Sequence, residues 1–376
     1  MDSWIAAAAE EIAGRASAEL EALVGVSSPS GDVRGAEEVF AIVRALLPDS
    51  AQVERPQCSS PDHAPDLLAT VAGTGQGRVV LLGHVDTVIS HADHRPLEDA
   101  GERLYGSGTV DMKGGDVLAL GVLRAFAREP QRFGELALLL VCDEEWRTAP
   151  FGHSDRFAGY DACLCFEAGQ TSPDGTDEVV VRRKAAGTLV VDAHGRSAHS
   201  GSAPDKGANA LLALTEAARI IAAQHDPAGP HRLTAVPTIL NSGEAFNVVP
   251  AAGRLLSDLR ADDEAAFRDV FDAVPEEFAG VHLERSMLRV WPGMDAREHA
   301  KPALARAADL LGRPVLGGAR GGASDASHMA TRIPVSIDGL GPRGGDAHHP
   351  DEYVLRASIQ PRAEVALALT AACCGR

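Results

Sequence analysis

The sequence is short of positive charge. Its 376 residues include 35 lysines and arginines against 53 aspartates and glutamates, which gives a formal net charge of −18. A general binder of nucleic acid or of an anionic membrane would carry the opposite sign, so we expect neither as a partner. An acidic surface favours solubility and is compatible with a cleft that binds cations.

Paired cysteine motifs are also missing. The six cysteines are irregularly spaced, none of them forms a CxxC pair, and Cys163 and Cys165 lie within an apolar stretch. This usage is typical of reduced thiols in a cytosolic protein rather than of a disulfide framework.

The sequence shows no signal for export or for membrane insertion. Its start, MDSWIAAAAEEIAGRASAELEALVGV, has no basic segment, and Glu10 and Glu11 interrupt the apolar part. We interpret it as an amphipathic helix rather than a signal peptide. No apolar run approaches the ~20 residues that span a bilayer, so we expect a cytoplasmic protein.

Short apolar strands alternate with helices in the first half of the chain. This order predicts an α/β layer structure with a mainly parallel sheet. The expected helices are residues 1–25, 34–47 and 114–129, and the expected strands are residues 66–73, 78–86, 134–145 and 161–169.

The pattern changes near residue 185. A β-α-β-β-α order follows, which suits a small two-layer α+β module. After about residue 293, a helix at 299–311 leads into glycine-rich loops and short apolar strands. We therefore predict a discontinuous main domain at 1–184 and 293–376, with an inserted domain at 185–292. A chain of this length suits about two domains.

Acidic residues and histidines follow several of the expected strands. In open α/β sheets, ligand sites form outside the carboxyl ends of the strands, so these side chains can converge on one cleft. The residues in question are His84 and Asp86, Asp111 in a glycine-rich loop, the triplet Asp143, Glu144 and Glu145, Glu167, and the pair His348 and His349.

Carboxylates that converge in this way repel one another unless cations are bound. Imidazole and carboxylate ligands without a set of thiolates suit Zn²⁺, with Mn²⁺ or Co²⁺ as substitutes. Two such ions at ~3.5–4 Å need a bridging ligand, and Asp111 can supply one. Each motif alone also fits an ordinary role, such as a strand cap for His84 or a solvated turn for residues 143–145. The combination favours a metal site.

Taken in order, the motifs resemble those of the M20 metallopeptidases, the group of glutamate carboxypeptidase G2, acetylornithine deacetylase and succinyl-diaminopimelate desuccinylase. The resemblance implies a dizinc aminopeptidase-like catalytic domain with an inserted two-layer α+β dimerisation domain. The matching stretches run from about residue 80 to 354: GHVDTV, YGSGTVDMKGG, DEE, FEAG, GRSAHSG with GANAL, NVVP, DLR, GGASDAS and HHPDEYV.

The resemblance implies two zinc ions per chain. His84 and Glu167 would bind the first ion, Glu145 would bind the second, and Asp111 would bridge both. The remaining ligand usually lies four residues before the glutamate of the EY pair. Counting back from Glu352 gives His348, which we prefer to His349.

Catalytic roles are implied for three further positions. Asp86 would orient His84, and Glu144 would be the general base toward a metal-bridging water. His199 of GRSAHSG, carried by the inserted domain of a homodimer, would reach the active site of the partner chain and stabilise an oxyanion. A surface histidine at the end of a strand is the alternative reading of His199.

Two positions resemble family residues that hold the substrate, Asn247 and Arg260. Arg260 suits a carboxylate by its bidentate geometry, although a salt bridge with a nearby acid is the alternative. Trp291 stands where the glutamate carboxypeptidase branch has an arginine, which weakens a strict specificity for C-terminal glutamate; Arg289 could compensate. His153 stands where a small or neutral residue is usual, and the sequence offers no reason for it.

The activity implied is cleavage of an amide bond next to a free carboxylate, with release of a C-terminal amino acid from a dipeptide or an N-acyl amino acid. The alternative is a deacylase such as acetylornithine deacetylase or succinyl-diaminopimelate desuccinylase. A more distant alternative is a catalytically silent, metal-binding dimeric homologue, against which the retained Glu144 argues.

Overall fold

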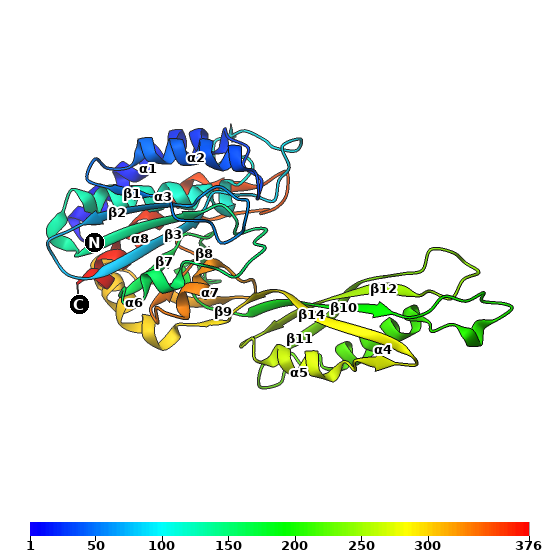
Figure 1. The fold of residues 1–376 in the computed structure, drawn as a ribbon. Helices are drawn as coiled ribbons and strands as arrows, with labels where there is room; N and C mark the ends of the chain where they lie inside the picture. The colour runs from blue at the N-terminus through cyan, green and yellow to red at the C-terminus, as the bar shows by residue number, and fades with distance from the viewer. Residues whose placement is uncertain (376) are drawn as a thin grey trace. The chain divides into compact units, whose positions relative to one another are not determined.

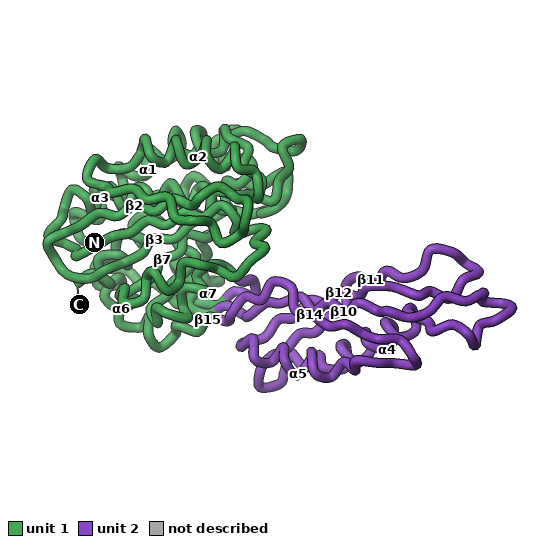
Figure 2. Tube along the Cα trace, viewed as in Figure 1, with its two compact units in different colours: residues 1–182, 294–319, 324–376 green, residues 183–293, 320–323 purple. Residues whose placement is uncertain are grey.

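The computed structural model describes residues 1–375 (Figure 1). The chain divides into two compact units (Figure 2). Unit 1 comprises residues 1–182, 294–319 and 324–376, and unit 2 comprises residues 183–293 and 320–323. The sequence places the boundaries at 184/185 and 292/293, and it gives no sign that residues 320–323 join unit 2.

Unit 1 is built on a six-stranded sheet in the order β1-β2-β6-β3-β7-β17. Strands β6, β3, β7 and β17 are parallel to one another. Strand β2 is antiparallel to both of its neighbours, β1 and β6. The α/β class and the mainly parallel sheet predicted from the sequence are confirmed. The strands of unit 1 are β1 (Gln52–Glu54), β2 (Leu67–Ala72), β3 (Arg78–His84), β4 (Glu98–Asp99), β5 (Arg103–Tyr105), β6 (Glu135–Val141), β7 (Ala162–Cys165), β8 (Gln170–Thr171), β9 (Asp177–Arg183), β15 (Met294–Asp295), β16 (Leu316–Arg320), β17 (Ser336–Ile337), β18 (Gly344–Gly345) and β19 (Tyr353–Leu355).

Both faces of this sheet are buried, which explains the continuous apolar strands. In β3, Val79 and Leu81 belong to the larger core cluster, whereas Val80 and Leu82 point into a smaller one on the opposite face. The helices of unit 1 are α1 (Ser3–Val24), α2 (Val33–Leu46), α3 (Gly114–Ala127), α6 (Arg297–Leu311), α7 (Asp325–Ala330) and α8 (Ile359–Cys374), with short turns at η1 (Thr109–Lys113), η2 (Pro130–Arg132), η3 (Ser154–Phe157) and η5 (Arg356–Ser358).

Helix α8 differs from the prediction made from the sequence, which places only loops and short strands after residue 311. The helix contacts α1, α3, α6 and strand β3, and almost every residue from Arg362 to Cys374 is buried. A helix that is buried on all sides has no polar stripe. Its sequence therefore lacks the amphipathic period by which a helix is recognised.

Unit 2 is a five-stranded antiparallel sheet in the order β11-β12-β10-β14-β13, with α4 and α5 packed against it. A buried cluster from the strands and both helices, including Leu189, Leu214, Leu259 and Phe267, forms its core. The elements are β10 (Ala185–His194), η4 (Pro204–Lys206), α4 (Ala210–Ala223), β11 (Thr234–Ser242), β12 (Ala252–Ala261), α5 (Ala266–Ala273), β13 (Glu277–Phe278) and β14 (Val281–Trp291).

Among residues 1–375, no helix is both long enough and apolar enough to cross a membrane.

Candidate metal centre

The carboxyl ends of three neighbouring parallel strands carry three of the five predicted ligands. Strand β3 ends at His84, which lies opposite Val141, the last residue of β6. Leu82 of β3 lies opposite Cys165, the last residue of β7. Glu144, Glu145 and Glu167 follow these ends within four residues, so the parallel register brings them to the same edge of the sheet.

Two groups of ligand atoms meet at this edge, and Asp111 belongs to both. His84, Asp111 and Glu167 form one group, and Asp111, Glu145 and His348 form the other; within each, the ligand atoms lie within 4.8 Å of one another. Asp111 Oδ1 lies 3.2 Å from His84 Nε2, and Oδ2 lies 3.1 Å from His348 Nε2. One carboxylate oxygen thus faces each histidine, as a bridging ligand requires.

This donor set fits a pair of divalent ions. It consists of two imidazoles and three carboxylates, which suits Zn²⁺ and its usual substitutes. His349, the rejected alternative to His348, does not belong to either group. Its Nδ1 instead accepts the backbone N–H of Asp351, and its side chain is 62% exposed.

Asp86 fixes both the imidazole of His84 and the turn that carries Glu144. Its Oδ1 lies 3.3 Å from His84 Nδ1, and its backbone oxygen lies 3.0 Å from the same nitrogen. The two carboxylate oxygens also accept the backbone N–H groups of Glu144 and Glu145, at 3.2 and 3.1 Å. One buried carboxylate therefore sets the orientation of His84 and the path of residues 144–145.

Glu352 holds the loop of Asp111, a role that the sequence did not suggest. Its buried carboxylate accepts the backbone N–H groups of Gly108, Val110 and Asp111 at 2.8–3.0 Å. Because Glu352 lies four residues after His348, this contact ties together the segments that carry two ligands of one group. The EY pair marks His348 by its spacing, but nothing in the sequence shows that its glutamate contacts the loop of Asp111.

Asp143, the first acid of the triplet, is compensated by Arg147. The buried guanidinium donates to Asp143 Oδ1 from Nε (3.2 Å) and Nη2 (2.9 Å), and to both oxygens of Asp325 at 2.5 and 2.8 Å. The Asp143–Arg147 pair spans a turn of the chain outside any helix, so its spacing gives no signal of the contact. The partnership with Asp325, which lies 178 residues away, carried no sequence signal.

Without a metal ion, protons balance the charges of this site. Hydrogen bonds to Asp111 and then Glu145 raise the pKa of His348 to about 10. Burial opposes ionisation of His84, yet hydrogen bonds to Asp111 and Asp86 raise its pKa well above the ordinary value. Bound cations would displace these protons, because metal ligands must be deprotonated.

The environment of Glu144 favours a proton acceptor of raised basicity. Burial raises the pKa of Glu144 well above its ordinary value; His84 opposes this shift, and the carboxylate of Glu167 adds to it. A general base works best when its pKa lies near the working pH.

The three other predicted site residues belong to unit 2. His199 is exposed, and its Nδ1 accepts the backbone N–H groups of Gly201 and Ser202, each at 3.1 Å. This arrangement leaves Nε2 as the ring nitrogen that donates. The backbone N–H of Ser200 donates to Asn247 O at 3.0 Å, so the loops of His199 and Asn247 are joined.

Arg260 lies on β12 and forms an ion pair within its own strand. Its Nε lies 3.2 and 3.1 Å from the two oxygens of Asp258. This is the kind of salt bridge that the sequence left open as the alternative role. Trp291 is the last residue of β14 and lies opposite Ala186 of β10.

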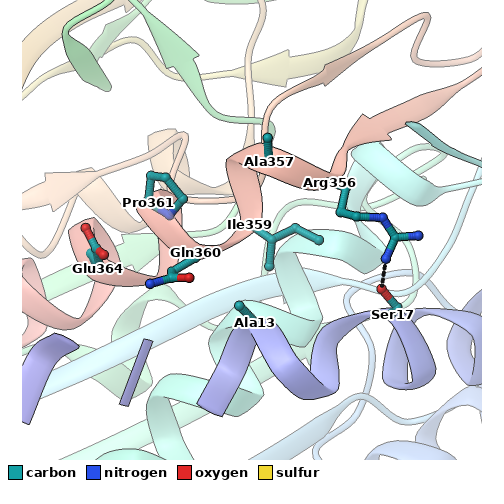
Figure 3. A pocket seen from close by; sticks show the side chains of 8 residues that line it. All are labelled: Ala13, Ser17, Arg356, Ala357, Ile359, Gln360, Pro361 and Glu364. Atoms are coloured by element: carbon teal, nitrogen blue, oxygen red, sulfur yellow. Dashed lines mark hydrogen bonds between the residues drawn. The ribbon is translucent and has the colours of Figure 1, made fainter. Parts of the chain in front are cut away.

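A separate cavity of about 410 Å³ in unit 1 contains none of the predicted site residues (Figure 3). Its lining comes from α1 and from the start of α8 with the turn before it, and Arg356 donates to Ser17 there at 2.9 Å. Its chemistry gives no reason to connect it with the metal centre.

Comparison with known proteins identifies relatives of this chain. The profile of the family described as Peptidase family M20/M25/M40 matches residues 80–372. Carboxypeptidase G2 of Pseudomonas sp. (strain RS-16) is 26% identical over 371 residues, covering 93% of this chain and 87% of the relative.

Two deacylases are similarly related. Succinyl-diaminopimelate desuccinylase of Methylorubrum extorquens (strain PA1) is 29% identical and covers 82% of this chain and 86% of its own length. Acetylornithine deacetylase of Proteus mirabilis (strain HI4320) is 26% identical, covering 80% of each chain.

Solved structures share the fold. Aminopeptidase PepT of Bacillus cereus superposes with a TM-score of 0.78 at 20% identity, covering 96% of this chain and 98% of its own. The YXEP protein of Bacillus subtilis, described as a dinuclear metal binding peptidase from the M20 family, has a TM-score of 0.69 at 14% identity, with coverage of 96% and 98%.

Proposed function

This chain belongs to peptidase family M20/M25/M40, and from that premise we propose that it is a zinc-dependent hydrolase of an amide bond next to a free carboxylate. The preferred reaction is release of a C-terminal amino acid from a dipeptide or an N-acyl amino acid. The observation that carries the proposal is the position of Asp111, whose two carboxylate oxygens face His84 and His348.

In this proposal, two zinc ions are held by the centre, with Co²⁺ or Mn²⁺ as substitutes. His84 and Glu167 would hold one ion, Glu145 and His348 would hold the other, and Asp111 would serve both. When bound, the ions supply Lewis acidity toward the amide carbonyl and the attacking water.

Glu144 moves the proton. Its carboxylate takes a proton from the attacking water and passes it to the nitrogen of the leaving amine. Asp86 acts as a positioning residue, because its oxygens accept the backbone N–H groups of Glu144 and Glu145 while it orients His84. Loss of Asp86 would therefore disturb both the base and a ligand.

Unit 2 supplies the groups that bind the substrate. His199, with Nε2 as the donating nitrogen, stabilises the oxyanion in the active site of a partner chain. Asn247 lies in the loop joined to that of His199 and contributes an amide. Arg260 binds the substrate carboxylate in competition with Asp258, which would weaken affinity compared with an unpaired arginine.

We infer a homodimer formed through unit 2. Strand β11 lies at the edge of its sheet, and Val236, Ile239 and Leu240 on it are between 36% and 49% exposed. An exposed apolar edge strand invites pairing with another chain. Sedimentation of the purified protein tests this inference, and Ile239→Lys should shift a dimer toward the monomer.

A deacylase is the second candidate, and the two deacylase relatives favour it. Such an enzyme removes an acyl group from an amino acid by the same proton transfers. The two candidates differ in the part of the substrate that the pocket selects. A carboxypeptidase selects the amino acid that leaves, and a deacylase selects the acyl group.

The test is hydrolysis by the zinc-loaded protein of N-acetyl amino acids, N-acetylornithine, N-succinyl-diaminopimelate, Xaa-Glu dipeptides and folate-like amides. Released amine is measured with and without a chelator. Cleavage of Xaa-Glu or folate-like amides supports the preferred reaction, and cleavage restricted to acetyl or succinyl compounds supports the deacylase. A chelator that leaves the rate unchanged would contradict both.

Glu144→Gln separates catalysis from metal binding. We expect turnover to fall by about 10²–10⁴-fold, in line with the usual contribution of a general base, while the metal content stays the same. Glu98→Gln, an exposed carboxylate in the same unit, is the control and should keep full activity. Equal activity in both variants would exclude Glu144 as the base.

A further inference from the structure

A third group of potential ligands lies outside the centre described above. Cys58, Asp66 and Cys142 each offer one ligand atom within 4.8 Å of the other two, and all three residues are buried. Among residues 1–375, the two other groups of this kind contain only nitrogen and oxygen donors. This group is therefore distinguished by its sulfur atoms.

The register of two strands builds the group. β2 is antiparallel to β6 and places Leu67 opposite Leu140. Continued by one residue, this register puts Asp66 opposite Val141 and next to Cys142, and Asp66 Oδ1 accepts the backbone N–H of Cys142 at 3.0 Å. Cys58 comes from residues 55–66, a segment between β1 and β2 without a helix or a strand.

His153 contacts the carboxylate of Asp66. Its Nε2 lies 2.8 Å from Asp66 Oδ2, and the imidazole is buried. The contact gives a physical reason for a histidine that the sequence left unexplained. Carboxylates that ligate metals are commonly held by such a hydrogen-bonding partner.

We propose that Cys58, Asp66 and Cys142 form a second metal site for a thiophilic divalent ion, Zn²⁺ in the first place, with His153 holding the carboxylate. Two sulfurs and one oxygen are ligands that zinc accepts, and magnesium and calcium do not favour sulfur. Three protein ligands leave the fourth position of a tetrahedral ion to a water molecule.

The charge balance permits binding, although the ion must compete with the protons of the ligands. A hydrogen bond with the Cys58 thiol, and then burial, raise the pKa of Cys142, and burial also raises the pKa of Asp66. The Cys142 thiol must therefore give up its proton when the ion binds. One divalent ion that displaces two thiol protons leaves the net charge of the buried group unchanged, which limits the cost of desolvation.

The site would fasten the segment 55–66 to the end of β6. Cys142 lies two residues before Glu144, so the ion would stiffen the strand end that carries the proposed base. The inference does not rest on the proposed function, because none of its three ligands belongs to the dinuclear centre.

Cobalt tests the site directly. The metal-free, reduced protein is titrated with Co²⁺, and the near-ultraviolet charge-transfer absorption from thiolate to cobalt is recorded. The dinuclear centre has only nitrogen and oxygen donors, so this absorption reports the new site alone. We expect an intensity at saturation that corresponds to one thiolate-bound ion per chain, and we expect added Zn²⁺ to remove it and to protect two thiols from alkylation.

Variants assign the signal. Cys58→Ser and Cys142→Ser should each abolish the absorption, whereas Cys163→Ser, a buried thiol on β7 outside the group, should keep it. The alkylation measurement needs no variant and holds if a serine variant does not fold. Absence of the absorption in the parent protein, its survival in Cys58→Ser, or a Cys58–Cys142 disulfide in the reduced preparation would each overturn the proposal.

Discussion

The carboxylate of Glu352 accepts the backbone N–H of Asp111 at 3.0 Å, although 241 residues separate the two. Glu352 also accepts from Gly108 and Val110, so it fixes the loop from which Asp111 reaches both histidines. The position of the bridging ligand therefore depends on a residue that lies outside the ligand set.

Glu352→Gln should weaken metal binding. The amide keeps the size of the carboxylate but turns an N–H donor toward backbone N–H groups that need acceptors. We expect zinc affinity to fall by about 10–100-fold, the usual effect of losing a partner that orients a ligand. Competition with a chromogenic chelator measures it. Asp351→Asn, at an exposed neighbour, is the control, and an equal affinity in both variants would refute the role of Glu352.

His348→Ala and His349→Ala form a matched pair. His348 Nε2 lies 3.1 Å from Asp111 and 3.2 Å from Glu145, whereas His349 contacts neither. We expect His348→Ala to lose one of the two ions and His349→Ala to keep both. Metal analysis after dialysis decides between them, and loss of an ion only in His349→Ala would reverse the assignment.

Arg147→Met should destabilise the fold. The change leaves Asp143 and Asp325 buried without their cation, and breaking a buried pair in this way costs about 3–5 kcal/mol. Urea denaturation measures the free energy of unfolding. Lys301→Ala, which removes an exposed partner of Glu298, should cost at most about 1 kcal/mol. Equal losses in the two variants would show that the network does not contribute as proposed.

Asp116 should make the metal-free protein less stable as the pH rises. Both of its carboxylate oxygens are buried without a hydrogen-bond partner, and burial raises its pKa from 3.8 to about 8. Between these values the folded chain keeps a proton that the unfolded chain releases, so the free energy of unfolding falls from about pH 4 to pH 8. Burial lowers the pKa of Lys113 to about 8, so its opposite effect begins only above that pH.

Asp116→Asn removes this titration. Denaturation of the chelator-treated protein at several pH values should give a shallower fall with pH for the variant than for the parent. Asp49→Asn, at an exposed position, should leave the parent profile unchanged. Parallel profiles for Asp116→Asn and the parent would contradict the raised pKa.

The sequence predicts those parts of the molecule that short-range patterns encode. Short continuous apolar runs and the polar residues after them locate β3, β6 and β7 and the acids at their ends. Contacts such as Arg147–Asp325 and Glu352–Asp111 join segments far apart in the chain, and no local pattern marks them. Helix α8 is not evident from the sequence, because complete burial removes the periodic change between polar and apolar residues that identifies a surface helix.

The burial of α8 also has a consequence for synthesis on the ribosome. Gly77, just before β3, closely approaches Cys374 at the end of the helix, with a positive φ of 79° that suits glycine. One face of the central sheet, which α3 covers in part, therefore lacks the rest of its cover until α8 has been translated. A nascent chain can likewise acquire its full set of metal ligands only after His348 has been translated. A ribosome that stalls before residue 359 would present the apolar side chains that α8 otherwise covers, and such a surface is a substrate for chaperones and proteases.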